Sequence, residues 1–311
     1  MPTEPLKKIL DRDLALVNVH EIARITSPLL RELVNNATNV FQRCNVAADG
    51  RGGVDEDIAP LCLYRIAAES TDSIDELIQR SCSLGALPLV RTAFEATLCL
   101  EYINTTDSAR RGLCWLYVYV LNRSKSYRLL KSTTHSGQTF STAWKKQFGK
   151  AFKEPDGIDK VMKNLESGMS KPHFRPITEE FDRMKSAKKK PEWYSLFGGP
   201  SNLRDMAISL NHEVDYDLLY RYWSSVAHAN DASHFLTKRL DRGAAFWGMR
   251  HPTEIPQIAL FAAQFLLKST ISMLARYRPS EDLKSWYLTD IKPRMDLLTN
   301  TRYDINSIEE E

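Results

Sequence analysis

Two charged side chains lie in the most apolar segment of the sequence. Arg91 and Glu95 fall within LPLVRTAFEATLCLEYI (87–103), where most other positions are hydrophobic. A helix that is apolar on nearly every side is normally buried, and residues four apart share one face and can pair. Because unpaired buried charges are costly, we expect a buried Arg91–Glu95 ion pair. It either locks helix packing or forms a pocket floor, with Glu95 as a base or ligand anchor and Arg91 as an anion clamp.

A second polar face is predicted in DYDLLYRYWSSVAHAND (215–231). Arg221, Ser224, Ser225 and His228 fall within two helical turns, and Arg221 and His228 are seven apart and nearly in line. Histidine is suited to proton transfer near neutral pH, and arginine to stabilising a developing negative charge. An Arg–His pair of this kind can cleave RNA without a metal. In the alternative interpretation, His228 caps the helix end or bonds to Glu95 across the core.

Further side chains near these two segments are candidates for binding. The aromatic ones would wall a pocket, and the polar ones lie along or just beyond the second helix: Tyr102, Trp193, Tyr194, Tyr220, Ser224, Asn230 and Asp231.

Motifs for phosphate or metal binding are missing from the sequence. It contains no P-loop, no GxGxxG and no HExxH. His228, Asp231 and His234 suggest a metal site, but the two histidines are six apart and would lie on different faces of one helix. We therefore expect neither a metal nor a cofactor.

The elements that must position these residues are helices throughout. Helical periodicity runs from residue 6 to about 47 as one or two helices, and a further helix begins at the acidic run 55–57. Pro88 suits the first turn of the helix 88–103, and Asp215 suits the cap of the helix that carries His228. Apolar periodicity returns at 255–276 and 281–298, and strand signals are almost absent. The expected fold is an all-α, single-domain multi-helix bundle.

Charge and composition suggest how the chain is divided. Residues 144–191 hold 13 Lys and Arg against 7 Asp and Glu, and the residues after Tyr303 are acidic. We expect N-terminal helices (1–50) packed on a main helical domain (54–298), with a basic insert at 144–191 and an acidic tail at 299–311. The net charge of +3 is too small to argue for nucleic-acid binding by itself.

Location and redox state are predicted from apolar runs and cysteines. The N-terminus lacks the apolar core of a signal peptide, and charges interrupt every apolar stretch before about 18 residues. We expect a cytoplasmic protein that makes no membrane contact. Cysteines at 44, 62, 82, 99 and 114 are spread through apolar patterns, which predicts buried, reduced thiols.

The segments that carry these residues resemble a known family. Its pattern has an R-x-x-x-E helix, then a W-Y segment, then a Y-x-x-x-S-x-x-x-H helix; here these are Arg91 and Glu95, Trp193 and Tyr194, and Tyr220, Ser224 and His228. The match, over roughly residues 60–275, resembles the bacterial and archaeal all-helical domain-of-unknown-function family five-six-seven-seven. That resemblance implies a fold and a site, and no particular reaction.

A looser resemblance is to the HEPN superfamily of helical ribonucleases, found in toxin and phage-defence systems. Its signature is an arginine followed by a histidine four to six residues beyond, and Arg221 and His228 have six residues between them. The residue after Arg221 is Tyr222, where the superfamily usually has Asn, Asp or His. The resemblance implies a HEPN-like core and a homodimer with the motif at its cleft.

These observations lead to one leading hypothesis and two rivals. The leading one is a metal-independent endoribonuclease of stress or phage defence, with His228 as acid/base, Arg221 as charge stabiliser, and Arg91 and Glu95 in support. One rival is a non-enzymatic binding module with an aromatic pocket above Arg91–Glu95, which senses a small metabolite or holds a partner helix. The other is an interaction subunit that binds a partner protein from the same operon through residues 144–191.

Overall fold

The chain folds into α-helices joined by short connections. The computed structural model describes residues 10–50, 55–227, 236–239, 243–246 and 249–300. The helices are α1 (Arg12–Asp49), α2 (Ile58–Ile78), α3 (Ser83–Thr105), α4 (Ser108–Leu130), α5 (His135–Phe148), α6 (Ile158–Met169), α7 (Arg175–Ser186), α8 (Leu203–Ser209), α9 (Arg221–Ala227), α10 (Ile255–Tyr277), α11 (Lys284–Trp286) and α12 (Lys292–Asn300). Short 3₁₀ segments are η1 (Asp55–Asp57), η2 (Pro172–Phe174) and η3 (Trp193–Gly198), and π-helices are η4 (Asp215–Tyr220) and η6 (Tyr287–Ile291). The all-α prediction is confirmed.

Contacts divide the chain into two compact units. The first unit comprises residues 1–53, 60–105 and 207–311, and the second comprises 54–59 and 106–206. The predicted basic insert, 144–191, lies inside the second unit, which also takes in α4 and η3. The predicted N-terminal helices are one helix, α1, which belongs to the first unit with α3 and α10.

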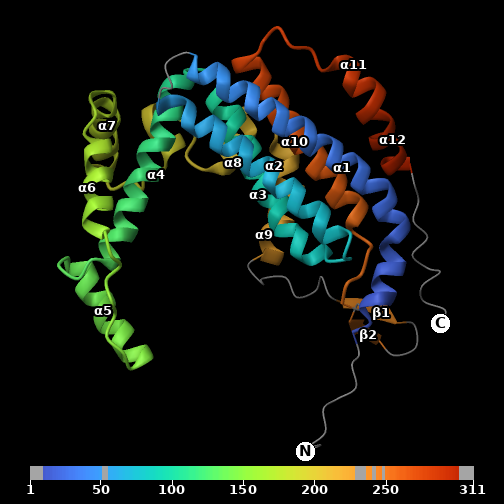
Figure 1. Ribbon diagram of the computed structural model, residues 1–311, viewed down its shortest axis with the longest axis horizontal. Coiled ribbons are helices and arrows are strands. Elements are labelled where there is room, and N and C mark those ends of the chain that lie inside the picture. The colour runs from blue at the N-terminus through green and yellow to red at the C-terminus, as the bar shows by residue number, and fades with distance from the viewer. Residues whose placement is uncertain (1–9, 51–54, 228–235, 240–242, 247–248, 301–311) are drawn as a thin grey trace, which may run out of the picture. The chain divides into compact units, whose positions relative to one another are not determined.

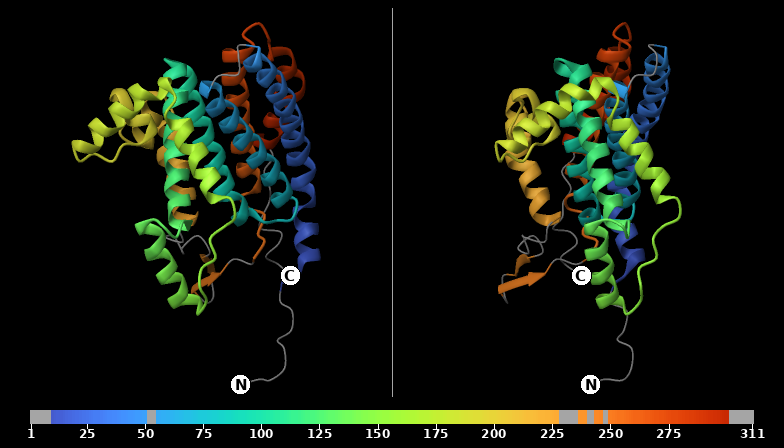
Figure 2. Two further views of the ribbon diagram at one scale, coloured as in Figure 1. Left: turned by 60° about the vertical axis from the view of Figure 1, so that its left-hand side comes forward. Right: turned by 90° about the vertical axis from the view of Figure 1, so that its left-hand side faces the viewer.

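The first unit is built on three long helices. Figures 1 and 2 show α1, α3 and α10 side by side, and α10 packs on both of the others. The face of α10 that packs inward includes Ile258, Ala262, Leu266 and Met273, each at most 2 % exposed. Helical spacing of these apolar residues explains why α10 begins and ends within a residue of its predicted bounds.

Helices α3 and α10 meet the length and hydropathy criteria for a membrane-spanning helix, which the sequence was not expected to do. By length and composition each is apolar enough to cross a membrane. In each, 56 % of the apolar window is buried inside the structure, and buried core helices pass the same test. The test therefore does not distinguish a membrane segment from a core helix.

The second unit is organised around α4. It packs against η1, α5 and α6, as Figure 1 shows for the helices. Gly112 on α4 permits the close approach of η1, because a Cβ there would overlap the carbonyl oxygen of Glu56. Tyr117 of α4 packs its ring on those of Phe174 and Phe181, 5.9 Å and 5.8 Å away, and so ties α7 to the same core.

Four details of the prediction were wrong. Pro88 lies inside α3, which begins five residues earlier at Ser83. Asp215 does not cap a helix; it begins the π-helix η4. A short antiparallel hairpin, β1 (Leu236–Arg239) with β2 (Gly243–Phe246), lies where no strand was expected. The five thiols are free, but Cys62 is exposed and Cys82 half-buried.

Candidate functional site

The predicted Arg91–Glu95 pair forms on α3. Arg91 Nε donates to Glu95 Oε1 at 2.9 Å, and Arg91 Nη2 donates to the Tyr220 hydroxyl at 3.1 Å. The guanidinium also lies over the Tyr220 ring, 5.0 Å from its centroid. The prediction that the pair is buried was only partly right, because 22 % of the Arg91 side chain and 36 % of the Glu95 side chain are exposed. We call Arg91, Glu95 and Tyr220 the Arg91 cluster.

Tyr220 is the last residue of the π-helix η4. Tyr216, one turn earlier, stacks on its ring at 4.7 Å. Burial, together with the charge of Glu95, raises the pKa of the Tyr220 phenol, so its oxygen accepts from Arg91 as a neutral hydroxyl. The Arg91 cluster thus fixes the end of η4 to α3.

A second polar cluster was missed in the sequence. His212 follows α8 and is placed by the way that helix ends. Asn211 adopts a left-handed conformation (φ 60°), and the His212 amide donates back to the Ala207 carbonyl at 2.7 Å. Together with the bond from the Asn211 amide to Ile208, this is a Schellman motif, in which asparagine substitutes for the more common glycine. The motif turns the His212 side chain into the first unit, where it is 7 % exposed.

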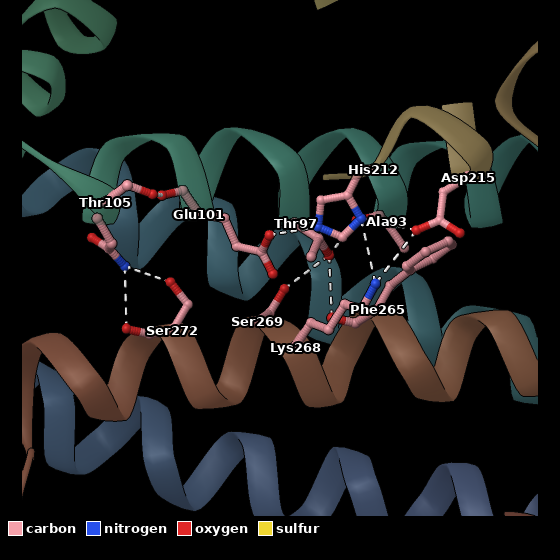
Figure 3. A network of polar contacts seen from close by, with 11 residues as sticks. Ala93, Thr97, Glu101, Thr105, His212, Asp215, Phe265, Lys268, Ser269 and Ser272 are labelled. Atoms are coloured by element: carbon pink, nitrogen blue, oxygen red, sulfur yellow. Dashed lines mark hydrogen bonds and ion pairs between the residues drawn. The ribbon is translucent and has the colours of Figure 1, made fainter. Parts of the chain in front are cut away.

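His212 lies between two carboxylates (Figure 3). Its Nε2 is 2.7 Å from Glu101 Oε2, and its Nδ1 is 2.8 Å from Asp215 Oδ2. Lys268 Nζ of α10 lies 3.4 Å from the same Asp215 oxygen. Because carboxylates only accept, both ring nitrogens are satisfied when both carry protons. We call Glu101, His212, Asp215 and Lys268 the His212 cluster.

The electrostatics of this cluster set its protonation state. Hydrogen bonds to Asp215 and Glu101 raise the pKa of His212 to about 9, against the opposing effect of burial. The bond from His212 lowers the pKa of Asp215 in turn. At neutral pH His212 is therefore a cation. Both of its ring nitrogens carry protons, so it can neither bind a metal nor act as a base. In the described part of the chain, no group of three or more His, Cys, Asp or Glu is arranged to hold a metal.

Helices α3 and α10 carry a polar seam that continues the His212 cluster. Thr97 on α3 donates to the Phe265 carbonyl at 3.2 Å and bonds to the Ser269 hydroxyl at 2.9 Å (Figure 3). One turn beyond Glu101, Asn104 donates to the Ser272 hydroxyl at 2.9 Å. The Thr97 and Ser269 hydroxyls are satisfied by these bonds, whereas the buried Oδ1 of Asn104 has no hydrogen-bond partner among the described residues.

Phe94 contacts both clusters. Its ring lies edge-on to His212 at 6.3 Å and packs on Tyr220 at 5.7 Å and on Phe265 at 5.2 Å. It is 1 % exposed. The two ends of η4, Asp215 and Tyr220, are therefore held by separate ionic clusters that share one apolar ring.

The predicted Arg221–His228 face is described only in part. Arg221 begins α9, and its side chain is 70 % exposed, with Asp217 Oδ1 at 3.8 Å as its ion-pair partner. The Ser224 hydroxyl is buried and has no hydrogen-bond partner among the described residues, so it does not share the exposure of Arg221. His228, Asn230 and Asp231 lie outside the described residues.

The aromatic residues predicted to wall a pocket are distributed over both units. Tyr102 is buried on α3, with 6 % exposure, in the first unit. Trp193 and Tyr194 lie in η3 of the second unit, their rings edge-to-face at 5.5 Å. The pocket that would join them to Tyr220 stays a prediction.

The His212 cluster predicts a pH dependence of stability. The folded pKa of His212 is raised above its ordinary value of 6.5, so its contribution is complete below pH 6.5 and is lost as the pH rises through about 9. Linkage gives at most about 3 kcal/mol for this loss. The lowered pKa of Asp215 has the opposite sign, and its contribution is lost as the pH falls below the ordinary value of 3.8. Urea unfolding between pH 6.5 and 9.5 measures the first effect.

His212→Gln removes the titrating ring, and its unfolding free energy should stay flat over that range relative to the parent. The matched control is His20→Gln, because His20 is an exposed histidine of the same unit. It should keep the full slope. A slope that His212→Gln leaves unchanged would assign the pH dependence to other groups.

Comparison with known proteins identifies a family and no individual relative. Residues 57–244 match the family of unknown function DUF5677. That range covers α3, both described clusters except Lys268, and Arg221 and His228. No curated protein and no solved structure matches the chain. The match spans more than half of the sequence, and the chain therefore belongs to DUF5677.

Proposed function

We propose that this protein is a HEPN-like, metal-independent endoribonuclease that acts in the cytoplasm in stress or phage defence. The observation that carries the proposal is the exposure of Arg221. Its side chain is 70 % exposed at the first residue of α9, and its ion-pair partner Asp217 is no closer than 3.8 Å. An exposed arginine with a long, weak ion pair is available to a phosphate group. His228 follows seven residues later in the sequence.

The anchoring of η4 supports a positioning role for the two clusters. Asp215, at one end, is held by His212 and Lys268, and Tyr220, at the other end, is held by Arg91. Arg221 is the next residue in the chain. π-helical turns occur often at functional sites, and anchoring both ends of the turn fixes the backbone from which the Arg221 side chain extends. In this proposal Arg91 and Glu95 support the site and do not react.

The proposed reaction is transesterification within the RNA backbone. His228 takes the proton from a 2′-hydroxyl, whose oxygen attacks the adjacent phosphorus. Arg221 stabilises the charge of the pentacovalent phosphorane. The P–O5′ bond then breaks, and the proton passes to the leaving 5′ oxygen. The products are a 2′,3′-cyclic phosphate and a 5′-hydroxyl.

The assay follows from this chemistry. Purified protein with excess EDTA should cleave a single-stranded RNA oligonucleotide and leave 2′,3′-cyclic phosphate and 5′-hydroxyl ends, identified by mass spectrometry. The same sequence made as DNA lacks the 2′-hydroxyl and should stay intact. Products with 5′-phosphate ends, or cleavage that EDTA abolishes, would contradict the proposed mechanism.

A homodimer is part of the proposal, because two copies of the Arg–His motif facing one cleft would grip a single RNA strand. Light scattering on the purified chain should then give twice the mass of 35.6 kDa. A monomer that cleaves RNA would contradict the proposed dimer but not the proposed cleavage mechanism.

A second candidate is a non-enzymatic binding module. The observation in its favour is that the Arg91 cluster is partly open, with 36 % of the Glu95 side chain exposed beside the Tyr220 ring. A module that senses a small metabolite or holds a helix of a partner protein needs such a site and no chemistry. Intact RNA after prolonged incubation, together with co-purification of a protein that Glu95→Gln releases, would favour this alternative.

A further inference from the structure

Helix α5 of the second unit and the residues just after it carry a cluster of four aromatic rings. Trp144 packs on Phe148 at 4.4 Å, on Phe152 at 5.3 Å and on Phe140 at 5.9 Å. Gly149 ends the helix in a left-handed conformation (φ 67°), and Phe152 beyond it returns to meet Phe140 edge-on at 5.1 Å. Of the four rings, Phe148 is the most exposed, at 51 %. The cluster therefore leaves the Phe148 ring exposed to solvent, whereas the other three rings are partly buried.

Positive charge surrounds this ring. The segment WKKQFGKAFK (144–153) contains four lysines and no acidic residue. The lysines, all exposed and with no carboxylate within 4.0 Å among the described residues, are Lys145, Lys146, Lys150 and Lys153.

Two nearby acidic side chains, Glu154 and Asp159, bond to other partners. Glu154 accepts from the amide and hydroxyl of Ser132, at 2.8 Å and 2.6 Å. Asp159 pairs with Lys131. Because these carboxylates are already bonded, the four lysines keep their charge for an external anion.

We propose that this α5 surface, Phe148 with Lys145, Lys146, Lys150 and Lys153, binds single-stranded RNA. Lysines that follow a phosphate backbone, combined with an aromatic ring on which a base stacks, are the two components of sequence-tolerant single-strand binding. The choice of RNA rests on the proposed function, and α5 itself takes no part in the cleavage. Its role is to hold the strand.

The shape of the surface favours a strand over a lipid bilayer. A helix that lies in a membrane interface needs a continuous apolar face. Phe152 packs on Phe140 and Trp144 and so occupies part of the apolar face of α5. One exposed ring among four cations suits a single stacked base and its phosphates.

The test measures RNA affinity in full-length protein that carries His228→Ala, so that binding is read without cleavage. Fluorescence polarisation with a labelled single-stranded RNA gives Kd over a range of salt concentrations. Lys145→Gln/Lys146→Gln should raise Kd about tenfold or more. It should also make the fall of the log association constant with log salt concentration less steep by about 1.4, since each phosphate contact to a single strand contributes about 0.7 to that slope. Phe148→Ala should raise Kd by about tenfold with the slope unchanged, because stacking is not ionic.

The matched control is Lys160→Gln/Lys163→Gln, which removes two exposed lysines of α6 in the same unit. It should leave both Kd and slope near the parent values. Equal losses in the control and the α5 variants, unchanged affinity in the α5 variants, or no RNA binding at all would overturn the proposal. The proposal would also be overturned if the α5 substitutions weakened binding to phosphatidylserine vesicles and left RNA affinity unchanged.

The outcomes for α5 and for catalysis are separable. If RNA binding depends on α5 but the parent protein does not cleave RNA, the inference about α5 is supported and the proposed nuclease activity is contradicted. Cleavage by the parent that survives the α5 substitutions, with unchanged KM, would retain the nuclease and remove this inference.

Discussion

His228→Ala should lower the rate of RNA cleavage by about 10²- to 10⁴-fold, the usual contribution of a general acid–base group. The loss should fall on kcat, because in the proposed mechanism the histidine moves a proton in the transition state and adds little to binding of the strand. Single-turnover cleavage of a labelled oligonucleotide, with protein in excess, measures this rate without product release. Affinity should stay close to that of the parent when both proteins are measured by polarisation on an RNA whose 2′-hydroxyls are blocked, which the parent cannot cleave.

Two controls make that result specific. His135→Ala changes an exposed histidine at the start of α5 and should retain full activity, which separates the effect from contamination by a host ribonuclease. Circular dichroism and thermal unfolding of His228→Ala should match the parent. Cleavage that persists in a folded His228→Ala protein would show that the histidine is not the proton-transfer group.

Phe94→Ala should destabilise the protein by about 3–5 kcal/mol, the range for removing a large aromatic side chain from a core. The ring is 1 % exposed and packs on His212, Tyr220 and Phe265 at once. Its removal leaves a cavity beside both ionic clusters, which cannot collapse without moving buried charges. Urea unfolding followed by circular dichroism measures the loss as a lower midpoint at constant slope.

A graded series tests that cause. Phe94→Leu retains most of the apolar volume and should cost less than Phe94→Ala. Leu84→Ala is the matched control on the same helix, because Leu84 is 42 % exposed and its truncation should cost less than about 1 kcal/mol. A loss for Phe94→Ala as small as that for Leu84→Ala would show that Phe94 does not join the two clusters to the core.

The long helices could be predicted because their evidence is local. The bounds of α10 follow from apolar residues at helical spacing, and the pairing of Arg91 with Glu95 follows from a separation of four residues. The start of α3 was predicted too late, because Pro88 was assigned to the first turn. A proline inside a helix has no N–H to donate, so it leaves one carbonyl of the preceding turn without a donor. In α3 that preceding turn forms nevertheless, and the helix begins at Ser83.

The His212 cluster could not be found in the same way. Its central residue lies in a helix-ending turn, where no periodicity marks a face, and Glu101 and Lys268 are 111 and 56 positions away in the chain. Only the packing of α3 on α10 brings them together. One local signal was present: Asp215 follows His212 by three residues, a spacing that allows a side-chain bond at the start of a helix. The π-helical turn at Asp215–Tyr220 left no signal in the apolar pattern.

That π-helical turn has a consequence for comparing members of the family. A turn of this kind places one more residue between two fixed points than an α-helical turn does. Between the anchored residues Asp215 and Tyr220, a relative with an ordinary α-helix would need one residue fewer to put its arginine in the same place. An alignment without a gap would then pair Arg221 with a neighbour of the true equivalent. Such a mismatch would disguise a shared Arg–His motif as a difference in spacing.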